Sequence, residues 1–349
     1  MNPQLLVEQL LAPAGSDAGR AASEPVVMPD FFPNAELIEQ EIAHVLAIKL
    51  SRPLAGWVEG YAQVGRRDPF LWTWARRGVE ITRLTCCEPS LENEVADTKV
   101  LGVMLDVMLD DVADNQKDLA FLEHLLDLLE TGGQELKKSL LPHQRAYARF
   151  TLDIWNEIQR RVKDFPRHAE FAELLQFDYR QLFNVMRYSR LMDEYPEMFN
   201  LVEHDLYLPH NMHMMVSSTM DMMCSPRFDR AEMGVVREAV WRGQCMGRIG
   251  NMITTWQREI GEDDFTSGVF ARAIACGDLK VTDLWSGNRE FIEGVIRENK
   301  HEEHFLERWQ AYRREILALA TRCRSVNLTD LVGGLQRLIC LHLGSRGKK

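Results

Sequence analysis

The chain has 349 residues, of which 46% are hydrophobic and 27% are charged. This is the composition of a globular protein, and a chain of this length can bury a core large enough to enclose an apolar cavity. The net charge of −11 at pH 7 argues against nucleic acid or an anionic membrane as the main partner. An anionic ligand stays compatible with it, because bound metal ions can reverse the local sign of charge.

The cysteine pattern and the hydropathy indicate a cytoplasmic protein. Seven cysteines without CxxC spacing fit buried, reduced thiols and neither a disulfide framework nor a zinc site. No stretch approaches the ~20 continuous apolar residues of a membrane span, and the N-terminus lacks a signal-peptide pattern. Residues 1–28 are predicted to form a flexible leader, and residues 29–349 a single domain.

The apolar residues beyond the leader recur with helical spacing, interrupted by short Pro and Gly breaks. Runs of β-branched residues with period 2 are nearly absent, so the predicted fold class is all-α, a single helical bundle around a central cavity. The predicted helices cover residues 35–50, 70–84, 91–112, 117–131, 140–163, 168–194, 200–224, 229–260, 267–275, 287–321 and 328–343.

The sharpest motif is Asp-Asp-Val-Ala-Asp at residues 110–114. Asp110 and Asp114 are four apart and share one helical face, and Asp111 sits three before Asp114. The preceding residues 100–104 are apolar, so the carboxylates are crowded beside the core and repel one another unless cations neutralise them. Carboxylate oxygens suit hard divalent cations, which suggests magnesium. The alternative is an ordinary solvated helix end, in a chain that has 52 acidic residues.

A second polar stripe lies well over a hundred residues later. Asn251, Thr255 and Glu259 follow one another at intervals of four and fall on one side of the predicted helix 229–260. An amide, a hydroxyl and a carboxylate oxygen can together hold one magnesium ion. Such stripes also occur on wet helix faces, but the neighbours here are largely apolar. The two motifs therefore predict two oxygen-bearing helix faces that meet across a bundle.

At these residues the chain resembles class I terpene synthases of the bacterial type. Asp110, Asp111 and Asp114 look like the family's DDxxD motif, and Asn251, Thr255 and Glu259 look like its NSE triad, with Thr in place of the commoner Ser. Arg258 precedes the Glu, where the family often has a basic residue. The resemblance implies the α-helical isoprenoid synthase fold for the catalytic domain. It also implies a cluster of three Mg²⁺ ions, for which Mn²⁺ can substitute.

The residues that would bind the substrate diphosphate match the family less well. The family places a diphosphate-sensing Arg a few dozen residues before the triad, beside a helix break. Arg187 and Arg190 lie somewhat early for this role, and the break near Pro209 carries His210 and His213 instead. Arg258 is a further candidate. Bacterial members often end in an Arg-Tyr pair, and the chain offers Arg346 without the Tyr.

The activity that this resemblance implies is that of a terpene cyclase acting on farnesyl or geranylgeranyl diphosphate, with Asp110 and Arg258 as catalytic residues. A chain-elongating prenyltransferase or a head-to-head condensing enzyme is the nearest alternative, although these normally carry two Asp-rich motifs. A non-catalytic helical binding protein is the alternative from another class, and a family member that binds without turnover is a third. Homodimerisation is an expectation from the family.

Several other side chains are open to two interpretations. Asp106 is interpreted as structural. The aromatic residues and the methionines of 212–223 are more typical of core packing than of a product-shaping wall. Trp72 and Trp74 are two apart and cannot both face the core of one helix. The aromatic residues available to face a cation are Trp72, Trp74, Phe150, Trp155, Tyr188, Trp256, Trp309 and Tyr312.

Overall fold

The computed structural model describes residues 29–348 except 117 and 134, so the predicted leader over residues 1–28 lies outside the described residues. All regular secondary structure in this described part is helical, which confirms the all-α prediction. Within it, no helix combines the length and the apolar character that crossing a membrane would require.

The helices follow one another with short connections. They are α2 (Ala35–Ala47), α3 (Arg52–Tyr61), α4 (Phe70–Ile81), α5 (Glu92–Asp110), the π turn η2 (Asp111–Gln116), α6 (Leu119–Thr131), α7 (Pro142–Lys163), α8 (His168–Glu194), α9 (Leu201–Tyr207), the 3₁₀ turn η4 (Leu208–Met212), α10 (Met214–Met223), α11 (Met233–Gly261), α12 (Gly268–Cys276), α13 (Val281–Leu284), α14 (Arg289–Glu298), α15 (His301–Leu319) and α16 (Leu328–Gly344).

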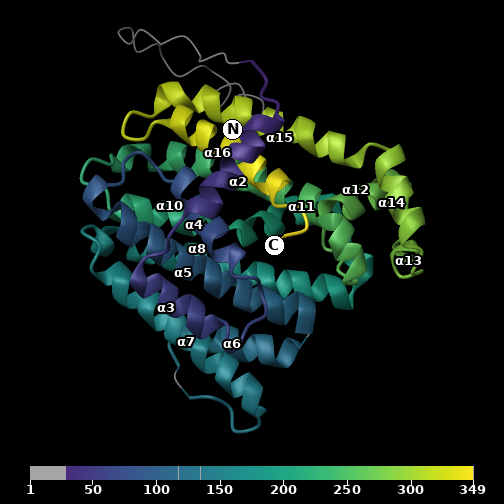
Figure 1. The fold of residues 1–349 in the computed structure, drawn as a ribbon, viewed down its shortest axis with the longest axis horizontal. Helices are drawn as coiled ribbons and strands as arrows, with labels where there is room; N and C mark the ends of the chain where they lie inside the picture. Colours follow the sequence, from purple (N-terminus) through teal and green to yellow (C-terminus); the bar gives the residue numbers. More distant parts are fainter. Residues whose placement is uncertain (1–28, 117, 134, 349) are drawn as a thin grey trace, which may run out of the picture.

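Six helices form a closed ring that positions the site. Helix α4 packs on α5, α5 on α8 and α10, α10 on α11, α11 on α16, and α16 returns to α4. Outside this ring, α7 covers α5, α15 covers α11, and α2 covers α16 (Figure 1). The helices α5, α11 and α16 are therefore packed on their outer sides as well, which leaves their inner sides to line whatever the ring encloses.

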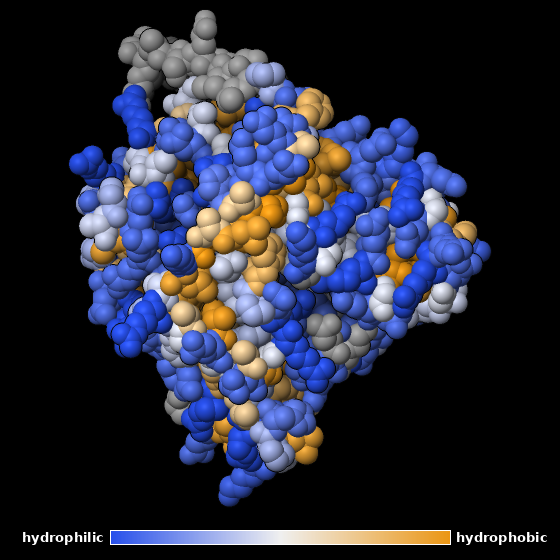
Figure 2. All heavy atoms as spheres, in the orientation of Figure 1, coloured by the Kyte–Doolittle hydropathy of each residue, from blue (hydrophilic) through white to orange (hydrophobic). Residues whose placement is uncertain are grey.

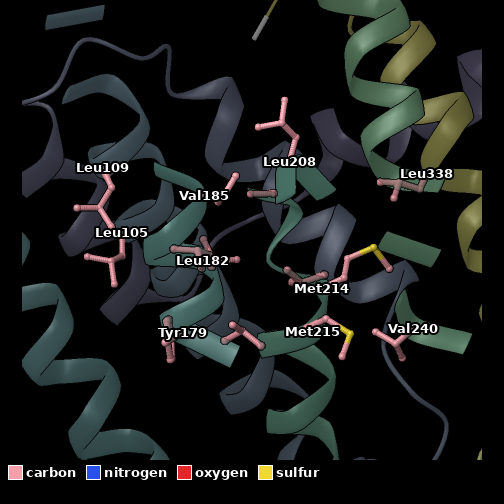
Figure 3. Close-up of a cluster of buried hydrophobic side chains, with 14 of the residues drawn as sticks. Leu105, Leu109, Tyr179, Leu182, Val185, Leu208, Met214, Met215, Val240 and Leu338 are labelled. Atoms are coloured by element: carbon pink, nitrogen blue, oxygen red, sulfur yellow. The ribbon is translucent and has the colours of Figure 1, made fainter. Parts of the chain in front are cut away.

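The core between these helices is built from fully buried aliphatic and aromatic side chains. Figure 3 shows Leu105 and Leu109 of α5 on one side of Leu182 and Val185 of α8. Helix α5 is apolar on nearly all sides because both α7 and the ring helices bury it. The face of the molecule in Figure 2 is largely hydrophilic, with hydrophobic residues in a band between the charged helices.

Two helices, α3 and the four-residue α13, are not among the predicted ranges. The sequence predicts a break at Pro53, but this proline occupies the first turn of α3, where Ser51 caps the helix by accepting a hydrogen bond from the Leu54 amide at 3.2 Å. Proline is tolerated there because the backbone N–H that it lacks would have no helical partner.

Two predicted helices were too long. The segment 200–224 is interrupted by η4 and by His213, and the segment 287–321 breaks at Lys300. Both residues have a positive φ, 57° for His213 and 54° for Lys300. Residues other than glycine adopt this backbone conformation at a cost in free energy. Apolar periodicity continues through both breaks, so the pattern alone could not reveal them.

Substitutions at two adjacent glycines of α16 test how closely this helix packs against the end of α4. A side chain at Gly334 would collide with the carbonyl oxygen of Ile81 at the end of α4, whereas one at Gly333 would meet no atom within 4 Å. Gly334→Ala is expected to lower the free energy of unfolding by ~1–3 kcal/mol, because backbone must move. Gly333→Ala is expected to be neutral or stabilising by up to ~1 kcal/mol, because alanine favours a helix. Urea unfolding of both variants measures this, and equal effects would contradict the close packing of α16 on α4.

Candidate active site

The ring of helices encloses a cavity of about 210 Å³, more than ten times the ~15 Å³ that one water molecule needs. Its lining has a charged end, formed mostly by residues that are buried or only partly exposed, and a second part in which apolar side chains alternate with a few polar ones. The charged end is made by Arg67, Asp110, Asp114, Arg248, Asn251, Thr255, Arg258, Glu259, Glu262 and Asp264. The apolar walls are made by Leu71, Trp74, Ala75, Val79, Val103, Val107, Met212, Met214 and Leu338.

The first motif lies where α5 changes into the π turn η2, and its aspartates point in different directions. Asp110 and Asp114 line the cavity. Asp111 is not among the lining residues; its Oδ1 accepts hydrogen bonds from Arg67 at 2.6 and 3.0 Å, and its Oδ2 accepts one from the Tyr61 hydroxyl at 3.4 Å. Turns of this wide type often occur at functional sites. The structure therefore brings two of the three predicted aspartates to the cavity.

The two cavity aspartates are partly buried and lie within electrostatic reach of one another. Asp110 accepts a hydrogen bond from Asn211 Nδ2 at 3.0 Å and lies 3.7 Å from Arg67 Nη2. Burial raises the pKa of Asp110. Burial and the neighbouring charges of Asp110 and Asp264 raise the pKa of Asp114 well above its ordinary value. Its Oδ1 is buried and has no hydrogen-bond partner among the described residues.

The second motif lies on α11 and faces the same cavity with all three residues. Asn251 Oδ1 accepts a hydrogen bond from Arg248 at 3.2 Å, and the Thr255 hydroxyl donates to the Asn251 carbonyl oxygen at 3.0 Å. Glu259 is only 7% exposed. Burial and the Asp264 charge raise its pKa to about 8, and its Oε2 has no hydrogen-bond partner in the described structure.

Asp264 connects the two motifs and was missed in the sequence. It lies in the loop after α11, where the backbone N–H and the hydroxyl of Thr266 donate to its Oδ1 at 2.9 and 2.8 Å. Its charge raises the pKa of Asp110, Asp114 and Glu259, so all three lie within electrostatic reach of it. The acidic run at 262–264 was the available signal, but nothing in the sequence shows the path of a loop.

Three arginines line the cavity, of which only Arg258 was predicted. Its Nε lies 3.4 Å from Glu262 Oε2. Arg67 precedes α4 and reaches the first motif, whereas Arg248 precedes Asn251 by one helical turn and reaches the second. The position of Arg248 three residues before Asn251 could have revealed it, because residues at that spacing share a helix face.

The structure does not bring the other three predicted arginines to the cavity. Arg187 forms ion pairs with Glu123 and Glu130 of α6, at 3.1 and 3.0 Å. Arg190 lies 3.8 Å from Glu194, one turn along α8. Arg346 donates to the Ile253 carbonyl oxygen at 2.6 Å and lies 3.8 Å from Glu302, on the outer side of α11. Arg187 and Arg190 lie on faces of α8 that point away from the cavity, and Arg346 lies in the turn after α16.

Trp72 and Trp74 are two residues apart in the sequence and point to different surroundings, as this spacing requires. Trp72 is buried against Tyr61, with ring centroids 4.7 Å apart, whereas Trp74 lines the cavity and donates from Nε1 to the Ser345 hydroxyl at 3.1 Å. None of the other six predicted aromatic residues is among the lining residues. Met212 and Met214 line the cavity, and the later methionines of α10 lie in the core.

The donors at the charged end suit a hard divalent cation. Two buried carboxylate oxygens, Asp114 Oδ1 and Glu259 Oε2, have no protein partner within the described part of the chain, although burying such groups unpaired is costly. Amide and hydroxyl oxygens accompany them on α11, and the set contains no sulfur or imidazole ligand. Oxygen-only donor sets of this kind are typical of Mg²⁺, Mn²⁺ and Ca²⁺ sites.

Comparison with known proteins supports the fold. No family model and no curated protein matches the sequence. Among solved structures, the fold is similar to isoprene synthase from grey poplar, solved with three Mg²⁺ ions and dimethylallyl-S-thiolodiphosphate (TM-score 0.60, 11% identity), and to abietadiene synthase from Abies grandis (TM-score 0.53, 11% identity). These matches cover 87% of this chain, but the chain spans only 54% and 40% of their lengths.

A bacterial structure matches over nearly its whole length. It is 2-methylisoborneol synthase from Streptomyces coelicolor, solved with Mg²⁺ and 2-fluoroneryl diphosphate, with a TM-score of 0.51, 13% identity, and coverage of 95% of this chain and 97% of the other. Identities this low establish the fold alone. That fold is the helical bundle of class I terpene synthases, as the two motifs predicted.

The raised carboxyl pKa values predict how stability depends on pH in the absence of metal. Because burial and the Asp264 charge hold the pKa of Glu259 near 8, this carboxyl group keeps a proton in the folded protein that it loses in the unfolded chain at lower pH. Buried histidines with lowered pKa values, such as His204 and His213, act in the opposite direction below about pH 6.5. The free energy of unfolding should therefore fall by at least ~1 kcal/mol as pH rises from about 6.5 to 8. Urea unfolding in EDTA measures this slope, and Glu259→Gln should reduce it. An equal slope in that variant would contradict the buried state of Glu259.

The same groups predict a stabilising effect of magnesium. A cation neutralises carboxylates that would otherwise repel, and a ligand that binds only the folded state raises its stability. Mg²⁺ is therefore expected to raise the melting temperature more at pH 8 than at pH 5.5, where protons compete for the carboxylates. Thermal unfolding with and without Mg²⁺ measures this difference. An effect of Mg²⁺ that is independent of pH, or that survives in Asp114→Asn and Glu259→Gln, would contradict the site.

Proposed function

We propose that this chain is a class I terpene synthase that ionises a linear prenyl diphosphate, releases diphosphate and converts the carbocation to a terpene. The observation that carries the proposal is a single cavity with two kinds of lining. Asp110 of α5, Asp114 of η2 and the three oxygen donors of α11 line one part of it, and apolar side chains form much of the remaining wall. This division matches a substrate that has an anionic head and a hydrocarbon tail.

Magnesium is the proposed cofactor, and three ions are expected from the resemblance. Asp110, Asp114, Asn251, Thr255 and Glu259 would hold the ions, and Asp264 lies close enough to contribute. Bound divalent ions supply Lewis acidity toward phosphate oxygens. Asp111 remains a candidate only if its ion pair with Arg67 opens. The solved isoprene synthase and 2-methylisoborneol synthase both contain Mg²⁺, which supports this choice of ion.

The protein's own cations would bind the departing group. Arg258, Arg248 and Arg67 line the charged end, where guanidinium groups can donate charge-assisted hydrogen bonds to phosphate oxygens. Such bonds strengthen as negative charge accumulates on the leaving diphosphate, so they lower the barrier to ionisation. Arg258 keeps the catalytic role that the sequence suggests. Arg67 and Arg248 take the place that Arg187, Arg190 and Arg346 were expected to fill.

The apolar walls would protect the cation that ionisation creates. Leu71, Val79, Val107 and Leu338 offer no nucleophile, so they keep water from most of the hydrocarbon chain. The face of Trp74 can stabilise positive charge through its ring quadrupole. We propose farnesyl or geranylgeranyl diphosphate as substrate and a cyclic sesquiterpene or diterpene as product. A cytoplasmic location and homodimerisation remain predictions from the sequence.

Direct assay separates this proposal from the rival functions. Purified protein is incubated with Mg²⁺ and each of the ten-, fifteen- and twenty-carbon allylic diphosphates, with and without isopentenyl diphosphate, and hydrocarbon products and released diphosphate are quantified. A terpene synthase forms product from the allylic substrate alone. Product that requires isopentenyl diphosphate, or that joins two substrate molecules, would indicate a prenyltransferase or condensing enzyme. Tight binding without release of diphosphate would indicate a binding protein.

Substitutions at the charged end should abolish turnover and leave the fold intact. Asp110→Ala and Asn251→Ala are each expected to lower the rate of diphosphate release by at least ~100-fold, because each removes an oxygen aimed at the site where leaving-group charge is neutralised. Arg187→Gln is the matched control, since this residue pairs with α6 outside the cavity, and it should retain the wild-type rate. Near-native rates in either motif variant, with unchanged circular dichroism, would contradict the assignment.

A further inference from the structure

Three buried polar atoms without a hydrogen-bond partner gather at the inner end of the cavity. They are Asp106 Oδ1 of α5, Tyr179 Oη of α8 and the Nε2 of His213 at the start of α10. The three side chains are 6%, 0% and 2% exposed, respectively. Asp106 and His213 line the cavity, and Tyr179 lies directly behind them. Leaving each such atom unpaired costs ~1–3 kcal/mol, so a group of them in a folded protein indicates a bound polar ligand.

One turn of α5 brings these atoms together. A side chain at Gly102 would collide with the His213 ring at Nε2 and would lie 3.4 Å from Tyr179 Oη, so both atoms border the same small region. Asp106 follows Gly102 by four residues on the same helix face. Its charge contributes to the raised pKa of Tyr179, which places the two groups near each other. The rings of Tyr179 and His213 are 5.9 Å apart in an edge-to-face arrangement.

His213 is fixed in this place by its backbone and by its second nitrogen. Its φ of 57° at the break before α10 turns the ring onto Gly102. Its Nδ1 lies 3.1 Å from the Ser217 hydroxyl, one turn along α10. With Nδ1 donating to Ser217, the lone pair of the ring is at Nε2, on the ring edge that lies against Gly102. A positive φ at a non-glycine residue that holds an unpartnered polar atom beside a cavity is typical of a functional residue.

We propose that Asp106, Tyr179 and His213 bind one water molecule at the inner end of the cavity, and that this water adds to the carbocation, so that the product is a terpene alcohol. This inference rests on the proposed function. A water needs two to four polar partners, and these three residues supply that number. Val103 and Val107 of α5 line the cavity beside this place, so the apolar part of a bound substrate would lie within reach of the water.

The addition of water to the carbocation forms one bond and releases one proton. The water oxygen forms a bond to the cationic carbon, and the resulting oxonium ion gives one proton to His213 Nε2. The imidazolium then loses this proton to solvent or to the released diphosphate. Burial and the Lys99 charge lower the pKa of His213 to about 3, so the ring is neutral before each turnover and releases the proton afterwards. The sum is prenyl diphosphate plus water giving a terpene alcohol plus diphosphate.

Isotope labelling tests the origin of the oxygen. The wild-type enzyme is assayed with Mg²⁺ and its preferred allylic diphosphate in H₂¹⁸O, and products are analysed by gas chromatography with mass spectrometry. The expected result is a cyclic alcohol as main product with one ¹⁸O atom. A hydrocarbon as main product, formed with release of diphosphate, would overturn the inference and leave the proposed function intact. Absence of any turnover would contradict both this inference and the proposed function.

Two tyrosine variants locate the water. Tyr179→Phe removes one partner of the water and should lower the ratio of alcohol to hydrocarbon about tenfold, the effect of one lost hydrogen bond, with little change in the rate of diphosphate release. Tyr188→Phe is the matched control. Tyr188 lies on the same helix and its hydroxyl is also unpartnered, but it packs against Tyr207 away from the cavity. Its product ratio should stay at the wild-type value.

His213→Asn gives an independent readout, because asparagine tolerates the positive φ but cannot take the proton in the same way. This variant should also shift product from alcohol to hydrocarbon. If Tyr179→Phe and Tyr188→Phe change the product ratio equally, or if neither Tyr179→Phe nor folded His213→Asn changes it, the three residues do not hold the quenching water.

Discussion

The structure depends on one unfavourable electrostatic arrangement. The carboxyl groups of Asp110, Asp114, Glu259 and Asp264 line one part of a cavity that also has extensive apolar walls. Like charges in a partly buried place repel one another, and burial together with this repulsion raises the pKa values of Asp110, Asp114 and Glu259. The nearby arginines offset only part of the repulsion. Bound cations would remove the repulsion between these carboxylates and so stabilise the folded protein. The relief of this repulsion contributes to the affinity of the site for cations.

Such a site needs a scaffold that does not relax, and the packing of α5 supplies it. Lys99 and Asp221 form a fully buried ion pair at 2.6 Å, and Asp221 also accepts the Leu84 backbone N–H at 2.9 Å. This pair joins α5 to α10 and to the connection that follows α4. Removing one partner of a buried pair typically costs ~3–5 kcal/mol. Helix α5 is thus anchored to α10 about three turns before Asp110.

The sequence predicts site residues that lie on a regular helix. It does not predict those whose position depends on the path of a loop or on the rotation of a helix about its axis. Asp110 on α5 and Glu259 on α11 could be predicted, because each lies at a spacing of four from another polar residue of its own motif on an otherwise apolar segment. Asp264 and Arg67 could not, because they stand on loops whose path depends on tertiary packing. Arg187 shows a third case: it lies on a correctly predicted helix, but the rotation of α8 turns it toward α6. Helix propensity and apolar periodicity predict where the helices lie in the sequence, whereas tertiary packing determines which face of each helix lines the cavity.

The same face of α5 also sets the geometry of the proposed reaction. Asp110, Asp106 and Gly102 succeed one another at intervals of four, from the charged end to the place where His213 and Tyr179 lie. Eight residues of helix span about 12 Å, so a rigid element separates the group that starts the reaction from the group proposed to end it. A cation formed at one end must carry its charge along the hydrocarbon chain before it meets water at the other. The length of that path is a property of the helix, and the contour of the apolar walls between its ends selects which carbon arrives there.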